Sequence, residues 1–394
     1  MSPTVTDLGE PDLYRTESRF DLWQAMARAD EVVWSGPGSS PHGFWSVFSY
    51  DACRSVLAPT APFTSEYGMM IGFDAKHPDR SGGRMLVVTD GAHHTRLRQL
   101  ITPFLSKAMA TTLDAFVERE VRSILAGPLA AGGADIARQV GPMLPAAVVC
   151  EILGVPERDR ERLIDLTNHA FGGSDSTFDR MTPSESHSEI LMYFHELVAA
   201  RRRVPGDDLV STLVADGRLG TRDVLVNCDN VLIGGNETTR HAITGCFHAL
   251  ATAPSTLDRL RAEPALLPTA VEEVVRWTSP AMHVLRVARQ DVEVAGRTLP
   301  EGSVVAAWLP AANRDERVFD RPHEFVPDRH PNRHLGFGTG PHHCLGAALA
   351  RAELAVLLRV LAEKVRSVRL AGQPRWLRGN LTQGYVRLPV ELGS

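Results

Sequence analysis

The sequence lacks several features that would place it in other classes of protein. Its five cysteines, Cys53, Cys150, Cys228, Cys246 and Cys344, are scattered and show no CxxC spacing. This usage indicates a reducing compartment without disulfides. The formal net charge is −5, so no basic surface for nucleic acid is expected.

Linkers and targeting segments are also missing. The first twenty residues contain no apolar run, so we expect neither a signal peptide nor a membrane anchor, and a cytoplasmic location. No Gly/Ser-rich or Pro-rich stretch divides the 394 residues. Length alone would allow two or three domains, but without a linker we expect one unit over residues 1–394. The composition, 43% hydrophobic and 23% charged, is that of a globular protein.

One stretch concentrates glycine around a single cysteine. Residues 336–346 read GFGTGPHHCLG, and an apolar segment with helical periodicity follows from Leu345 to Val365. Such glycine density indicates a backbone that turns tightly or lies against something flat. Cys344 is thus expected at or just before a helix N-terminus, where the helix dipole favours a thiolate. A thiolate held on a rigid loop can ligate a metal.

Taken alone, Cys344 has two other interpretations. A lone cysteine is often a small buried hydrophobic residue. A zinc site is the other metal interpretation, because four histidines lie nearby: His330, His334, His342 and His343. Zinc sites built on thiolates usually pair their cysteines, and no second cysteine is close in the sequence.

The run from Phe337 to Gly346 resembles the haem-binding signature of the cytochrome P-450 superfamily, Phe-Gly-x-Gly-x-His-x-Cys-x-Gly, at every fixed position. The resemblance implies that Cys344 is the proximal ligand of the iron of haem b. It also implies that Phe337, Gly338 and Gly346 pack around the cofactor and that His342 reaches a propionate. A cysteine axial ligand favours cleavage of the O–O bond.

A second pattern is a long predicted helix with two glycines in its middle. The helix is expected to start with Thr221 as its N-cap and to end before Pro254, a length of about 45 Å at 1.5 Å per residue. Gly234 and Gly235 each cost about 1 kcal/mol there relative to alanine, and helices kink at glycine pairs. The Thr238 hydroxyl is expected to bond the Gly234 carbonyl and open the helix locally. The alternative is a glycine pair that serves close helix packing.

The segment Gly-Gly-Asn-Glu-Thr-Thr, residues 234–239, resembles the family's oxygen-binding motif. The resemblance assigns catalytic roles to Thr238 and Glu237, which would help to activate oxygen and relay protons. We expect the haem to lie between this helix and the one that follows the cysteine loop.

Three basic residues are implied to hold the haem propionates. His94 and Arg98 are four apart, so they share one helix face, and arginine suits a carboxylate because its fork is bidentate. They lie in a run similar to the family's His-Thr-Arg-Leu-Arg segment. Arg286 lies in the extended segment 280–288. For the first two, a solvated helix face is the alternative.

Glu273 and Arg276 match the family's short Glu-x-x-Arg motif, and Arg329 is the implied third member of a structural network. If exposed, a pair with this spacing contributes only about 0.2–0.5 kcal/mol. If buried, the loss of one partner would cost several kcal/mol.

The substrate pocket is expected to combine apolar and polar side chains. Residues 60–88 form a long aperiodic loop, which indicates function, and the resemblance places it over the distal side of the haem. Its candidates are Met69, Met70, Ile71, Phe73, Leu86 and Val87. On the long helix, Asn227, Asn230, Gly234 and Thr238 share one face. The expected pocket residues are Met70, Val87, Asn230, Gly234, Met282, His283 and Gln383.

Three hydrogen-bonding side chains in that set predict a substrate with oxygen or nitrogen functions, such as a polyketide or a modified peptide. The alternative is that Asn230 bonds a neighbouring helix or loop and never meets the ligand.

The predicted fold is mainly α with a small β part. Helices are expected at 17–29, 51–58, 109–125, 142–153, 157–169 and 185–203, with a lid at 172–184 and strands at 43–50 and 280–308. The implied function is a haem-thiolate monooxygenase that acts on a small organic molecule, and the expected substrate is a natural-product intermediate.

No flavin or nicotinamide fingerprint is evident, so electrons are expected from a ferredoxin and its reductase. We expect O₂ to be the co-substrate. We expect the protein to be a monomer. The alternatives are a peroxygenase, an isomerase or an oxidative-coupling enzyme, and a haem protein that only binds a ligand.

Overall fold

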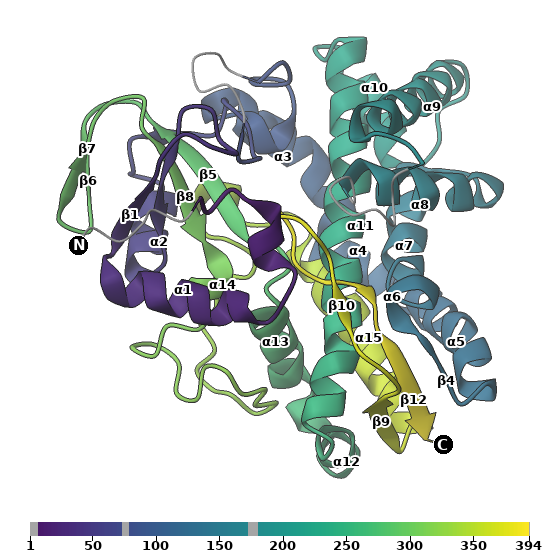
Figure 1. The fold of residues 1–394 in the computed structure, drawn as a ribbon. Coiled ribbons are helices and arrows are strands. Elements are labelled where there is room, and N and C mark those ends of the chain that lie inside the picture. Colours follow the sequence, from purple (N-terminus) through teal and green to yellow (C-terminus); the bar gives the residue numbers. More distant parts are fainter. Residues whose placement is uncertain (1–6, 73–78, 172–179, 394) are drawn as a thin grey trace.

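Figure 1 shows the largest β-sheet on one side of the molecule and most of the long helices on the other. The computed structural model describes residues 7–72, 79–171 and 180–393. The helices are α1 (Ser18–Ala29), α2 (Tyr50–Leu57), α3 (Gly91–Leu105), α4 (Lys107–Thr112), α5 (Asp114–Ala130), α6 (Ile136–Gln139), α7 (Met143–Leu153), α8 (Glu157–Phe171), α9 (Pro183–Arg203), α10 (Leu209–Ala215), α11 (Thr221–Thr252), α12 (Thr256–Ala262), α13 (Leu267–Thr278), α14 (Leu309–Ala312) and α15 (Ala347–Lys364).

The strands are short and form four small sheets. They are β1 (Val32–Ser35), β2 (Phe44–Val47), β3 (Phe63–Thr64), β4 (Gly133–Asp135), β5 (His283–Ala288), β6 (Val292–Val294), β7 (Arg297–Leu299), β8 (Val304–Trp308), β9 (Ser367–Leu370), β10 (Arg375–Trp376), β11 (Tyr385–Arg387) and β12 (Pro389–Gly393). The largest sheet has the order β1-β2-β8-β5-β3, and only its β2–β8 pair is parallel. The mainly α class with a small β part is confirmed.

Most of the predicted helices are confirmed by α1, α2, α7, α8 and α9. The one predicted at 109–125 is instead divided at Leu113 into α4 and α5. The hydroxyls of Thr111 and Thr112 donate to the carbonyls four residues earlier, at 3.0 and 3.1 Å. Such bonds compete with the helix ladder at the point where α4 ends.

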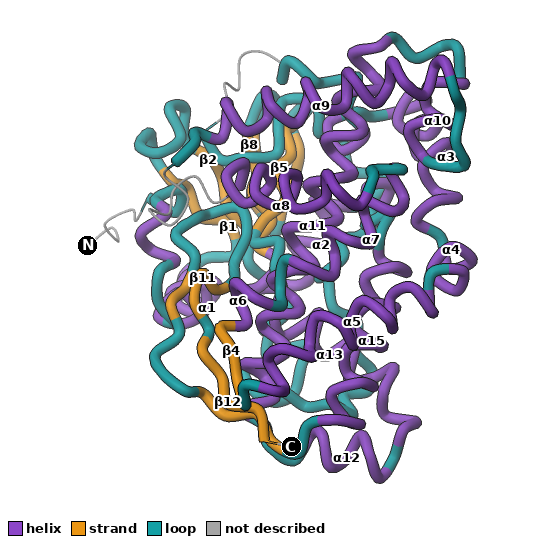
Figure 2. The backbone as a smooth tube through the Cα atoms, turned by 90° about the vertical axis from the view of Figure 1, so that its right-hand side faces the viewer, coloured by secondary structure: helices purple, strands orange, loops and turns teal. Residues whose placement is uncertain are grey.

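The long helix α11 forms the centre of the helical side (Figure 1). Its N-cap is Gly220 rather than Thr221, because the Asp223 carboxylate accepts from the Gly220 N–H at 2.9 Å. The Thr221 hydroxyl instead accepts from Arg202, at 2.6 Å. Figure 2 shows α9 and α8 side by side above α7 and α5, and both α9 and α8 contact α11.

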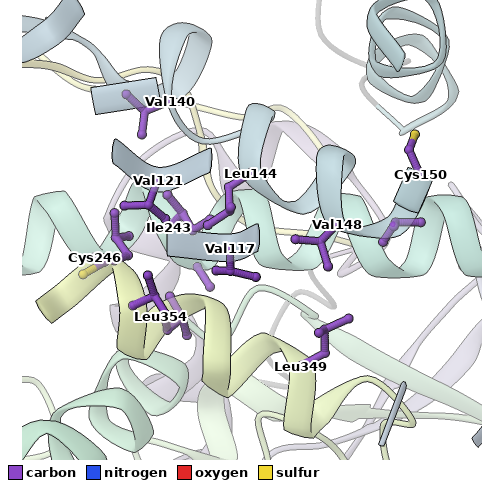
Figure 3. Close-up of a cluster of buried hydrophobic side chains, with 14 of the residues drawn as sticks. Val117, Val121, Val140, Leu144, Val148, Cys150, Ile243, Cys246, Leu349 and Leu354 are labelled. Atoms are coloured by element: carbon purple, nitrogen blue, oxygen red, sulfur yellow. The ribbon is translucent and has the colours of Figure 1, made fainter. Parts of the chain in front are cut away.

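Buried aliphatic side chains hold α15 against α11 and α5. Figure 3 shows Leu349 and Leu354 of α15 on one side of α11, with side chains of α5 and α7 close by. One stretch of the described residues, Ile136–Leu153, is apolar enough to cross a membrane, but 78% of it is buried inside this core. The stretch is therefore part of the hydrophobic core rather than a membrane span.

Candidate functional site

The loop of residues 336–346 turns at two glycines and presents Cys344 to a cavity. Gly338 and Gly340 have φ of +65° and +75°, which glycine adopts readily. A Cβ on Gly340 would lie 2.2 Å from the Leu57 carbonyl oxygen. The Cys344 N–H donates to the Phe337 carbonyl at 2.9 Å. Protein surrounds Cys344, yet its side chain is accessible because it lines the cavity.

That cavity, of about 300 Å³, lies between the cysteine loop and α11. A second cavity of about 230 Å³ adjoins it on the side of β5. Both are lined by Val87, Asn230, Gly234 and Thr238, so these residues stand at the junction. The first cavity is sandwiched by two helices, as a flat cofactor requires, and the second offers space for a small molecule beside it.

Basic side chains, one buried and two partly buried, gather at the rim of the two cavities. His94 and Arg98 of α3 line the first, and Arg286 of β5 lines the second. Within the described residues, the His94 Nε2 atom is buried without a hydrogen-bond partner. Burial, together with His342 and Arg98, lowers the pKa of His94 to about 4. Burial also lowers the pKa of Arg286 to about 10. These groups fit a cofactor that carries carboxylates.

The two glycines of α11 act differently. A Cβ on Gly235 would lie 2.5 Å from Val149 Cγ2, whereas one on Gly234 would meet nothing within 4 Å. Gly235 thus permits close packing against α7, and Gly234 leaves the cavity open. The Thr238 hydroxyl donates to the Gly234 carbonyl at 3.1 Å, as predicted. The expected local opening is absent, since α11 is continuous helix from Thr221 to Thr252.

The comparisons with known proteins agree with one another. A cytochrome P450 family model matches residues 180–364. The cytochrome P450 NovI of Streptomyces niveus is 34% identical over 98% of this chain and 96% of the relative. The mycinamicin IV hydroxylase/epoxidase of Micromonospora griseorubida is 35% identical over 88% and 89%. The crystal structure of P450 OxyD, involved in the biosynthesis of vancomycin-type antibiotics, superposes with a TM-score of 0.94 at 61% identity, covering 98% and 99%.

The chain belongs to the cytochrome P450 family. It is a bacterial-type P450, its relatives are monooxygenases and hydroxylases, and its cofactor is haem b. The cavity fits that cofactor: Cys344 faces it from one side, Gly234 from the other, and the two arginines at the rim, Arg98 and Arg286, suit the two propionates. Among the residues of the described ranges, no three His, Cys, Asp or Glu side chains converge on a metal position, which argues against zinc.

The surroundings of Cys344 in this P450 have opposing effects on the pKa of its thiol. Burial raises the pKa of the thiol, while the Gly346 N–H and the cations Arg98 and Arg351 act in the opposite direction. Arg351 also lies 4.5 Å above the Phe337 ring and is paired with Glu272 at 3.0 Å. Phe337, Gly338 and Gly346 all line the haem cavity.

His342 has an unexpected protein partner. Its Nε2 lies 2.9 Å from Asp90 Oδ1 and 3.2 Å from the Ser65 hydroxyl. Burial would raise the pKa of Asp90, but His342, Thr64 and the Ser65 N–H lower it further than burial raises it. The His342 ring stacks at 4.3 Å from that of His94. Asp90 therefore orients His342 at the cavity rim, and the sequence motif gave no signal for this carboxylate.

Glu237 is buried beside Thr238. It accepts from Arg240 at 3.0 Å, and His241 Nε2 lies 3.6 Å from its other oxygen. Burial would raise the pKa of Glu237, but Arg240 and His241 together hold it below its usual value. Glu237 is thus a carboxylate on the wall of the second cavity.

The structural triad is brought together in the interior. Arg276 donates to both Glu273 oxygens at 2.7 and 2.8 Å, and Arg329 donates to Glu273 at 3.0 Å. Glu273 and Arg276 are fully buried and Arg329 is 8% exposed. Of the two alternatives predicted for Glu273 and Arg276, the structure therefore shows the buried network and not the exposed ion pair.

The structure corrects three of the expected pocket residues. Met70 is 52% exposed, and its neighbour Met69 lines the second cavity instead. Met282, which directly precedes β5, is fully buried and packs in the core with Trp308. Gln383 donates to the Thr278 and Ser279 carbonyls at 2.7 and 3.0 Å. His283 does line the second cavity, with Nδ1 2.9 Å from the Asn380 carbonyl.

Three ionisable residues at the cavities escaped the sequence reasoning. His187 and Asp229 line the second cavity with Nδ1 and Oδ2 3.2 Å apart. Glu353 of α15 lines the haem cavity, and burial raises its pKa to about 8. Asp229 and Glu353 are acidic residues within apolar helix faces, and this sequence pattern could have identified them as candidate site residues. Phe73 and residues 172–179 of the expected lid lie outside the described residues.

Proposed function

We propose that this P450 oxidises a polar natural-product intermediate, and specifically a precursor of an antibiotic of the vancomycin type. The observation that carries the proposal is the second cavity, where Thr238 meets an apolar wall that also bears Asn230, His283, Asp229 and His187. The 61% identity with OxyD, which is involved in the biosynthesis of such antibiotics, supports the substrate class.

The polar side chains of that cavity suit a ligand with amide, hydroxyl or amine groups. Burial alone would lower the pKa of His187, but Asp229 raises it above its usual value, so the two form an ion pair at the cavity wall. Polar groups buried by a ligand are costly unless they are hydrogen-bonded. A bare hydrocarbon would desolvate Asn230 and the ion pair without compensation, whereas a peptide-like or polyketide-like molecule would satisfy them.

In this proposal the haem, when bound through Cys344, supplies the oxygen chemistry. The chain's own residues orient the substrate and control protons. Glu237 accepts a proton and donates it toward Thr238. The Thr238 hydroxyl then donates a proton into the space where the two cavities meet. His94, Arg98, Arg286 and His342 fix the orientation of the propionates.

Electrons come from outside the chain in this proposal, from a ferredoxin and its reductase, and O₂ is the co-substrate. We further propose one haem domain over residues 1–394 that works as a cytoplasmic monomer.

The test is a spectral-shift titration of the haem-loaded protein with vancomycin-type precursors, polyketides and bare hydrocarbons. We expect precursors to bind best and Asn230→Leu to weaken them at least about tenfold, the effect of an unpaired buried polar group on the ligand. Asn230→Asp, which keeps a polar side chain of the same size, should bind more tightly than the leucine variant. A hydrocarbon as the best ligand, or unchanged affinity in Asn230→Leu, would contradict the proposal.

Turnover provides the second half of the test. With ferredoxin, its reductase and NADPH, the best-binding compound should yield a product that carries one oxygen from ¹⁸O₂. Formation of the same product from peroxide alone, with none from the ferredoxin system, would indicate a peroxygenase instead.

A further inference from the structure

A third cavity, of about 460 Å³, continues along α11 beyond the haem. It is lined by His241, Gly245 and His248, which follow Thr238 at intervals of three, four and three residues and therefore lie on the same stripe of the helix. α13 and β11 pack against this half of α11 (Figure 1). Glu17, Ser18 and Asp21 at its rim are exposed, so the cavity opens to solvent.

The walls of this third cavity carry buried polar atoms that require water. Within the described residues, His241 Nδ1, His248 Nδ1, Gln383 Oε1 and Tyr385 Oη are buried and have no hydrogen-bond partner. All four side chains line the cavity. Buried polar groups are bonded to protein or to ordered water, and a polar space of this size holds several waters. Water therefore extends from the rim to the His241 ring.

His241 stands between that water and Glu237. Its Nε2 lies 3.6 Å from a Glu237 oxygen, just beyond hydrogen-bond distance, and within the described residues both ring nitrogens are buried without a hydrogen-bond partner. Gly384 makes room for the ring, because a Cβ there would lie 2.0 Å from Nδ1. His241 is only 2% exposed, and it lines the third cavity.

We propose that His241 relays protons from the water of the third cavity to Glu237. The inference rests on the proposed role of Glu237 in proton delivery. A proton is taken up from water on the ring nitrogen that faces the cavity, and the proton on the other nitrogen passes to the Glu237 carboxylate. The starting tautomer is restored when Nδ1 returns its proton to the cavity water and Nε2 takes up another from that water as the ring turns, so one proton passes from water to Glu237 in each cycle and no group is oxidised or reduced.

The charges around the ring suit this role. Glu237 and Arg240 flank it on α11, His248 lies further along the same helix, and Arg314, His323 and Tyr385 line the cavity from other elements. Burial lowers the pKa of His241, with Arg240 in the same direction and Glu237 opposing. The resting ring is thus neutral at pH 7 and has a nitrogen able to accept a proton.

The first test needs neither turnover nor a variant. Histidine C2–H exchange is measured by mass spectrometry on the haem-loaded protein in D₂O. If water reaches the ring, His241 exchanges far faster than global unfolding allows, although it is buried. His334, which is paired with Glu272 at 3.0 Å, serves as the buried reference and His195 as the exposed one. Exchange at His241 only at the rate of global unfolding overturns the proposal.

The second test separates relay from structure. His241→Gln keeps a hydrogen-bonding group beside Glu237 but cannot carry a proton, and Gly384→Ala displaces the ring. Each should lower product formed per NADPH about tenfold, less than the roughly 10²–10⁴-fold that a group transferring a proton directly contributes, because His241 acts through Glu237, and should raise the solvent isotope effect. Haem content and substrate affinity should not change. Gly379→Ala is the control, because a Cβ there meets nothing closer than 3.8 Å.

Glu237→Gln distinguishes the two levels of the proposal. If it lowers product per NADPH while His241→Gln and Gly384→Ala do not, the relay is wrong and the role of Glu237 stands. If Glu237→Gln also changes nothing, the proton assignment within the proposed function is wrong as well.

Discussion

The Thr238 hydroxyl donates to the Gly234 carbonyl at 3.1 Å, and one and a half turns later the Thr244 hydroxyl donates in the same way to the Arg240 carbonyl at 2.8 Å. The two threonines make the same local bond on one continuous helix. Only Thr238 lines the haem and substrate cavities, whereas Thr244 is 1% exposed and lies in the core. Comparing substitutions of the two threonines therefore separates the effect of a hydroxyl in the cavity from the effect of a hydroxyl bonded within the helix.

We expect Thr238→Ala to divert electrons from product to peroxide while haem and substrate binding persist. The reason is that the hydroxyl at the junction of the cavities is removed without a change in the core. The measurement is product formed and hydrogen peroxide released per NADPH. Thr244→Ala is the matched control and should keep the wild-type ratio. Equal effects of the two substitutions would show that the helix bond, rather than proton delivery, matters.

Cys344→Ser should abolish the thiolate-type Soret band of the reduced carbonyl complex. Cys344 lines the haem cavity, and the serine oxygen does not supply the electron donation of a thiolate. Cys53→Ser is the control, since the Cys53 thiol already donates to the Val47 carbonyl at 3.5 Å and a serine hydroxyl can replace it. Persistence of the band in Cys344→Ser would mean that another residue ligates the iron.

The elements with strong local signals were predictable from sequence. The glycine loop around Cys344 and the bond from Thr238 to Gly234 depend on residues close together in the chain, and both are present. Contacts between distant segments carried no such signal. The sequence could not show that Gly235 faces Val149 or that Asp90 meets His342, since these pairs are set by tertiary packing.

Single-residue choices were the weakest part of the prediction. Met69 and Met70 are adjacent and alike in type, and only the turn of the loop decides which one faces the cavity. Met282 shows the same ambiguity, because its neighbours Ala281 and His283 line the second cavity while Met282 itself packs in the core. Gln383 looked like a pocket residue, but its amide satisfies two carbonyls at the end of α13.

Arg276→Ala should destabilise the haem-loaded protein by about 3–5 kcal/mol, because Glu273 would be left as a buried charge with its main partner removed. Arg276 also donates to the carbonyls of Asn313, Pro322 and Glu324, which would lose their partners. The measurement is equilibrium unfolding in urea. Asp328→Asn, which breaks the half-exposed pair with Arg259, should cost no more than about 1 kcal/mol. Similar losses in both variants would show that burial of the network adds nothing.

The two glycines of α11 should respond oppositely to alanine. Both substitutions gain about 1 kcal/mol of helix propensity. At Gly235 the new methyl group would overlap Val149, which lies 2.5 Å from the Cβ position, and overpacking of this kind costs about 1–3 kcal/mol. Gly235→Ala should therefore lower the urea midpoint, whereas Gly234→Ala should leave it unchanged or raise it.

The function of the two variants should show the reverse order. The Gly234 methyl group would project into the space shared by the haem and substrate cavities, so Gly234→Ala should weaken the spectral response to substrate. The double variant Gly235→Ala/Val149→Ala tests the packing argument directly, because the smaller valine replacement makes room for the methyl group. Its loss of stability should be smaller than the sum of the two single losses, since residues in contact are coupled. If the two losses simply add, contact with Val149 is not the reason that a glycine is needed at position 235.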